Sequence, residues 1–254
     1  MTSDLLESIL RRDRVVIAAA LAAIALLCWG YLAWLAAGPA HSMESMAPAM
    51  SHWSAADFVV MLLMWWVMML GMMIPAAAPM ILIYARVARQ ARDRGTPFAP
   101  AAWFAVGYFL AWLGFALAAT ALQWGLENAL LLSPATARVA PSAGGALLIA
   151  AGLYQWTPLK DACLAHCQSP FRFIQRHGFS GELGGAVRLG LRHGAYCIGC
   201  CWALMILLFV GGVMNLLWIA AIAALVLAEK LIVLRFIRHA AGIALVAAGV
   251  ALLA

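Results

Sequence analysis

The residues best suited to chemistry are three cysteines and a histidine in the sequence RHGAYCIGCC. On a helix, His193, Cys197, Cys200 and Cys201 share one face, because residues three, four, seven and eight positions apart lie close together. Thiolate and imidazole groups are ligands that Cu(I) and zinc select in proteins. The spacing therefore predicts a soft-metal site, with buried cysteine as a small apolar residue as the alternative.

A second group of the same residue types precedes it in the sequence DACLAHC. Cys163, His166 and Cys167 are three and four residues apart, so on a helix they too would face the same way. Metal ligation is favoured over structural disulfides, which are rare in the reducing cytosol. It is also favoured over a thiol–disulfide relay to quinone, which ordinarily faces the oxidising side of a membrane. Cys28 stands apart and is interpreted as an inert core residue.

Methionine is concentrated in the stretch Met61–Met80, MLLMWWVMMLGMMIPAAAPM. Met64, Met68 and Met72 fall on one stripe of a helix, at intervals of four residues. Such a row of thioethers could pass a soft cation along the helix, because each sulfur binds it weakly enough to release it. The alternative is that the stripe packs against other helices or faces lipid.

The segment before this stretch, residues 38–56, is rich in the same soft ligands and contains no lysine or arginine. Its histidines and methionines are spaced closely enough to surround one ion, and thioether and imidazole donors suit Cu(I). Methionine as a flexible apolar filler is the alternative. The predicted ligands of this segment are His41, Met43, Met46, Met50 and His52.

Membrane helices must position these residues, because 67% of the 254 residues are apolar and only 10% are charged. A helix needs about 20 apolar residues to cross a bilayer core, and several runs have that length. The sequence predicts an all-α polytopic membrane bundle that forms a single domain, residues 1–254. Its seven predicted transmembrane helices cover residues 15–37, 57–84, 101–126, 140–156, 194–212, 216–234 and 240–253.

The basic residues predict the orientation of this bundle. All but one of the 16 lysines and arginines lie on one side of the predicted spans, and the exception is Arg138. Because basic loops stay in the cytoplasm, the N-terminus is predicted inside a bacterial cell and the C-terminus outside the inner membrane. Residues 38–56 then form a periplasmic His/Met loop, and residues 157–193 form a cytoplasmic loop with Cys and His residues and an amphipathic segment. The net charge of +6 comes from these loops and indicates anionic lipid, not nucleic acid, as the partner.

Two ionisable residues, Glu229 and Lys230, lie late in the sixth predicted span. Charged groups inside a membrane are costly and ordinarily have a partner or a function. Glu229 is predicted to pair with Arg192 or His193. If it pairs with His193, it would orient the imidazole without binding the metal itself. Both side chains could instead reach the inner headgroups.

Three strings of the sequence are distinctive: MWWVMMLGMMIPAAAPM, YQWTPLKDACLAHC, and LRHGAYCIGCCWALMILLFVGGVMNLLW with a later EK. In these strings the chain resembles a family of bacterial integral membrane proteins that is described as predicted metal-binding, a domain of unknown function. The resemblance spans residues 57–230, and the Cys-Cys-Trp stretch is its most specific part. It implies metal binding and supplies no substrate or mechanism.

Together these features predict a membrane protein that binds a soft metal, copper before others, and transports or delivers it across the inner membrane without catalysis. One alternative is a membrane thiol–disulfide oxidoreductase that exchanges electrons with quinone. Another is a structural or assembly subunit of a larger membrane complex. The expected partners are the lipid bilayer and a metal ion, together with another membrane protein or a second copy of the chain.

Overall fold

A computed structural model of the chain describes residues 2–37, 53–96, 98–133, 137–178, 181–232 and 234–254. These residues form an all-helical fold, as predicted, and the β pairing seen among them is an isolated bridge between Leu132 and Val139. The described helices are α1 (Thr2–Ala37), α3 (Ala55–Asp93), α4 (Ala101–Asn128), α5 (Pro141–Tyr154), α6 (Pro158–Gln168), α7 (Pro170–His177), α8 (Leu183–Ile206), α9 (Leu208–Gly211), α10 (Leu216–Leu231) and α11 (Arg235–Leu253).

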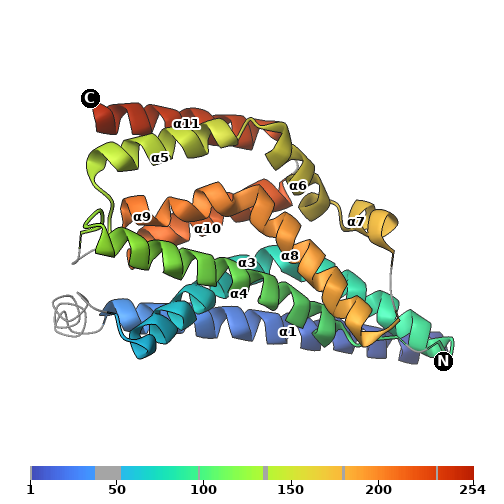
Figure 1. Cartoon of the computed structure of the whole chain (residues 1–254). Coiled ribbons are helices and arrows are strands. Elements are labelled where there is room, and N and C mark those ends of the chain that lie inside the picture. The colour runs from blue at the N-terminus through green and yellow to red at the C-terminus, as the bar shows by residue number, and fades with distance from the viewer. Residues whose placement is uncertain (1, 38–52, 97, 134–136, 179–180, 233) are drawn as a thin grey trace.

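The long helices run back and forth in layers, as Figure 1 shows. Helices α1, α3 and α4 form the lower part of the view, α8 and α10 the middle, and α5 with α11 the top. The short helices α6 and α7 lie at the right-hand side. The N-terminus and the C-terminus lie at opposite ends of the molecule, which is the arrangement expected for an odd number of passes.

Five helical segments in the described part of the chain are long and apolar enough to cross a membrane. They comprise residues 15–37 of α1, the whole of α3, α4 and α11, and residues 183–211. The other two predicted spans correspond to α5, with 14 residues, and α10, with 16. A 14-residue helix is only about 21 Å long, whereas a bilayer core is about 30 Å thick. Seven crossings therefore stay a prediction.

Three helices begin well before the predicted spans. Helix α1 starts at Thr2 rather than at residue 15. Helix α8 starts at Leu183 rather than at residue 194, and α11 starts at Arg235 rather than at residue 240. Arginine has a good helix propensity, so the charges that ended the predicted apolar runs do not end the helices. The predicted loop 157–193 is correspondingly helical through α6, α7 and the first turns of α8.

Glycines allow α4 and α8 to pack with their backbones in contact. A Cβ atom added to Gly107 of α4 would overlap the Val187 carbonyl oxygen, and one added to Gly190 of α8 would overlap that of Phe104. Small residues permit such close approach of membrane helices, where dispersion replaces the hydrophobic effect as the main attraction. This contact places the first half of α8 against the first half of α4.

Candidate metal centre

Helix α8 brings its three cysteines and His193 onto one buried face, as predicted. Cys197, Cys200 and Cys201 are each at most 2% exposed, and His193 is buried with them. The thiols of Cys200 and Cys201 donate hydrogen bonds to the Cys197 carbonyl oxygen at 3.0 and 2.9 Å. Because α8 begins at Leu183, these residues lie near its middle rather than at the inner end of the span.

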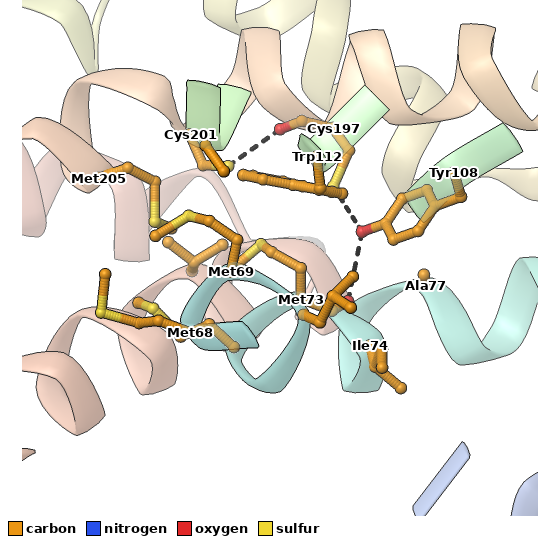
Figure 2. Packing of buried hydrophobic residues seen from close by; sticks show 14 of the residues in the cluster. Met68, Met69, Met73, Ile74, Ala77, Tyr108, Trp112, Cys197, Cys201 and Met205 are labelled. Atoms are coloured by element: carbon orange, nitrogen blue, oxygen red, sulfur yellow. Dashed lines mark hydrogen bonds between the residues drawn. The ribbon is translucent and has the colours of Figure 1, made fainter. Parts of the chain in front are cut away.

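Side chains from α4 and α10 contact the thiol of Cys197, and both also contact Met73 of α3. The Lys230 ammonium of α10 donates a hydrogen bond to Cys197 Sγ at 2.8 Å and lies 3.8 Å from Met73 Sδ of α3. The Tyr108 hydroxyl of α4 lies 3.1 Å from Cys197 Sγ and donates to the Met73 carbonyl oxygen at 3.3 Å (Figure 2). A thiol, a thioether and an ammonium therefore meet at one buried point.

Helix α6 supplies the second predicted pair of thiols. The sulfurs of Cys167 and Cys200 lie 3.8 Å apart. Cys163 lies against Gly199, where a Cβ atom would come within 2.7 Å of its sulfur. Both α6 cysteines are half-buried, whereas the α8 thiols are buried. Burial, reinforced by the neighbouring Cys200, raises the pKa of the Cys163 thiol, which favours its protonated form.

The other face of α6 borders a cavity of about 480 Å³ that is also lined by residues of α7, α10 and α11. Residues 161, 164, 165 and 168 of α6 line it, and this spacing is one helical face. Cys163 and Cys167 lie on the side of α6 that meets α8. A single helix therefore separates the cavity from the thiols.

The two predicted histidine ligands pack on aromatic rings. The His166 ring stacks on Tyr196, with centroids 4.2 Å apart and planes at 7°, and its Nδ1 hydrogen-bonds to the Ala162 carbonyl oxygen at 2.8 Å. The His193 ring meets Phe173 edge to face, with centroids 5.1 Å apart. Nε2 of His166 and Nδ1 of His193 are buried without a hydrogen-bond partner, so each imidazole retains a nitrogen that could bind an ion.

Glu229 pairs with Lys160 and not with the predicted Arg192 or His193. Lys160 Nζ donates to Glu229 Oε2 at 2.6 Å, and both side chains are buried. The same ammonium also donates to the side-chain oxygen of Gln155. The prediction failed because residues 157–193 were expected to form a loop, whereas α6 holds Lys160 against α10. Glu229 therefore joins α6 to α10 and does not orient the imidazole.

The methionine stripe of α3 faces the interior of the bundle. Met64, Met68 and Met72 are each at most 5% exposed, so these three side chains do not face lipid. Met73, which lies beside this stripe, is the methionine whose sulfur reaches the thiol site. Figure 2 shows Met68 and Met73 on the turns of α3 that lie below Cys201 and its neighbours.

The remaining predicted ligands, His41, Met43, Met46, Met50 and His52, lie outside the described residues and stay a prediction. Within the described residues, no three His, Cys, Asp or Glu side chains are grouped so as to hold a metal ion. A closed structural zinc site needs four such ligands, so the described part of the chain contains no preformed site of that kind. Its sulfur groups instead form pairs and include a thioether, which Cu(I) accepts as a ligand.

Three residues at this site were not predicted as part of it: Tyr108, Lys230 and Met73. Lys230 had a signal, since an ionisable residue in an apolar helix ordinarily has a function or a partner. Met73 lies in the methionine-rich stretch but off the predicted stripe. Tyr108 has no distinguishing feature in the sequence, and only the packing of α4 on α8 brings it to Cys197.

The fold and the site define an all-helical protein whose five apolar helices suggest membrane insertion and whose core contains buried thiols and thioethers. The chain belongs to a copper chaperone family, PpoB2, whose model matches residues 62–252. The matched region contains Met73, Lys230 and all the cysteines of α6 and α8. No curated protein matches the chain, and no solved structure does. The predicted resemblance to a metal-binding family is thus confirmed in its coarser form, a copper-related family.

Proposed function

We propose that the protein holds Cu(I) among the sulfurs of α3, α6 and α8 and passes it to another protein at the membrane. These sulfurs, here called the sulfur cluster, belong to Met73, Cys163, Cys167, Cys197, Cys200 and Cys201. The observation that supports this function best is their convergence from three helices, with Cys167 3.8 Å from Cys200 and with Lys230 contacting both Cys197 and Met73. Thiolate and thioether ligands select Cu(I), and the family is described as a copper chaperone.

Transfer would proceed by exchange of one sulfur ligand at a time. Cys163 and Cys167 are only half-buried. A copper donor or acceptor would therefore reach these two thiols first, from the side of the bundle that α6 covers. Cu(I) then passes from Cys167 to Cys200 over the short distance between their sulfurs, and on to the buried Cys197. Each step trades one thiolate for another, so the ion is never released into an apolar interior without a ligand.

The proposed setting is the bacterial inner membrane, with the N-terminus in the cytoplasm. The membrane-length helices and the distribution of basic residues support it. In this orientation the cysteines of α8 lie near the middle of their span, and the segment 38–56, with its histidines and methionines, lies in the periplasm. That segment would then collect copper, and the thiols would hold it more tightly.

Copper retention by the purified protein tests the proposal. The full-length chain is purified in detergent after loading with Cu(I) under reducing conditions, and its metal content is measured by elemental analysis. We expect the wild-type protein to retain copper. The triple variant Cys197→Ser/Cys200→Ser/Cys201→Ser should lose most of it, because serine oxygen is a poor ligand for a soft ion.

Cys28→Ser is the matched control, since Cys28 is also buried in a helix but lies against Gly71, away from the cluster. It should retain copper at the wild-type level. Equal copper in the triple variant and in the wild type would contradict the proposed site.

The distance between Cys167 and Cys200 also favours one other function, that of a thiol–disulfide oxidoreductase. A disulfide requires sulfurs at about 2.05 Å, so a small rotation of two side chains would bring this pair together from 3.8 Å. Its formation would release two protons and two electrons, which a membrane quinone would accept. Mass spectrometry of protein alkylated in intact cells distinguishes the two functions, because the oxidoreductase requires a Cys167–Cys200 disulfide and the copper protein requires free thiols.

A further inference from the structure

Lys230 places a positive charge inside the sulfur cluster. The residue is only 4% exposed, and its Nζ lies 2.8 Å from Cys197 Sγ and 3.8 Å from Met73 Sδ. The carboxylate next to it in the chain, that of Glu229, is paired with Lys160. The sulfur of Cys197 is therefore the group that can balance the buried ammonium, and a buried charge without such a partner is strongly destabilising.

The charge of a loaded site follows from its ligands. An ion bound by two thiolates and a neutral thioether leaves a net charge of −1 if the ion is monovalent and zero if it is divalent. The ammonium of Lys230 adds one positive charge in either case. The site is then neutral with a monovalent ion and carries an uncompensated positive charge with a divalent ion. Such a charge is costly in an apolar interior.

We propose that Lys230 makes the sulfur cluster selective for Cu(I) over divalent ions such as zinc. The ammonium contacts two of the three sulfurs that would hold the ion, those of Cys197 and Met73, so it must move aside on loading. The flexible four-carbon stem of lysine allows this movement while the charge stays in the same buried region. The inference rests on the proposed function, because it requires the cluster to bind a metal ion. It makes Lys230 a residue that sets specificity without being a ligand.

Competition experiments on the full-length protein in detergent test this role. The affinity for Cu(I) is measured anaerobically against a coloured Cu(I) chelator, and the affinity for Zn²⁺ against a zinc chelator. Lys230→Leu removes the charge and offers no ligand, whereas Lys230→Arg keeps the charge. We expect Lys230→Leu to lower the preference for Cu(I) over zinc by about tenfold or more, since one full charge is removed from a buried site. Lys230→Arg should restore the preference at least in part.

The control separates charge from packing. A purely structural role for Lys230 would weaken the binding of both ions alike, and this result, or a preference unchanged in Lys230→Leu, would overturn the inference. Lys230→Gln provides a second neutral variant if Lys230→Leu does not remain monodisperse and helical. Wild-type protein that binds no Cu(I) would refute the proposed function itself and this inference with it, whereas copper-binding variants with unaltered selectivity refute only the inference.

Discussion

At the scale of the residue, this chain keeps two lysines in its interior and gives each a side-chain partner. Lys160 meets the Glu229 carboxylate at 2.6 Å, and Lys230 meets the Cys197 sulfur at 2.8 Å. Breaking a buried ion pair by removing one partner leaves a charge that the protein cannot solvate. The adjacent residues Glu229 and Lys230 thus have different partners. Glu229 joins α10 to α6 through Lys160, whereas Lys230 contacts the sulfur cluster.

Lys160→Met should destabilise the protein by about 3–5 kcal/mol, because it leaves the Glu229 carboxylate buried and unpaired. The double variant Lys160→Met/Glu229→Gln should recover most of this loss, since neither charge then remains. Unfolding in detergent, followed by the helical circular dichroism signal, measures both effects. A double variant no more stable than the single one would show that the pair has no such role. Wild-type copper retention in the double variant would confirm that Glu229 does not act through His193.

At the scale of the element, the site depends on how closely α8 packs against its neighbours. Gly107 and Gly190 let α4 and α8 come into backbone contact, and this contact brings Tyr108 to 3.1 Å from Cys197 Sγ. Gly199 in turn makes room for Cys163 of α6. The thiols converge because glycines on α8 and α4 remove the side chains that would otherwise keep the helices apart.

Gly107→Ala should therefore destabilise the protein by about 1–3 kcal/mol, as overpacking does in a well-filled interior, and should reduce copper retention by shifting α8. Gly114→Ala is the matched control on the same helix, because a Cβ atom at Gly114 meets open space. It should be neutral or slightly stabilising, by up to about 1 kcal/mol, since alanine is the better helix former. The unfolding temperature and the copper content are measured for both variants. Equal stability and equal copper content in the two variants would contradict the packing argument.

At the scale of the whole molecule, the two termini lie at opposite ends of the helical bundle (Figure 1). An odd number of membrane crossings has this consequence. The described helices include five of full membrane length, so the question for the intact protein is whether the shorter α5 and α10 also cross, or whether both stay buried among the longer helices.

A pair of terminal fusions tests the predicted orientation and the odd number of crossings, which five and seven crossings share. We expect green fluorescent protein at the N-terminus to fluoresce, because it matures in the cytoplasm, and alkaline phosphatase at the C-terminus to be active, because it matures in the periplasm. The exchanged pair, with each reporter at the other end, serves as the control and should be inactive. Both ends on the same side would establish an even number of crossings and would contradict the predicted orientation.

Much of the candidate site could be predicted from local spacing. The common face of His193, Cys197, Cys200 and Cys201, and that of Cys163 and Cys167, follow from the helical repeat alone, and the structure confirms that the α8 residues are buried together. The inward direction of the Met64, Met68 and Met72 stripe was left open by the sequence, because an apolar side chain suits lipid and protein interior alike.

The all-helical class and the soft-ligand chemistry were thus determined by the sequence itself, through composition and the periodicity of sulfur-containing residues. The tertiary structure alone decided which groups meet: the Cys167 sulfur with the Cys200 sulfur, and the Lys230 ammonium with the sulfurs of Cys197 and Met73. It also decided that Glu229 forms its ion pair with Lys160. The physical reason is that periodicity describes one helix at a time, whereas these contacts join residues 33, 69 and 157 positions apart in the chain, and their formation depends on how whole helices pack.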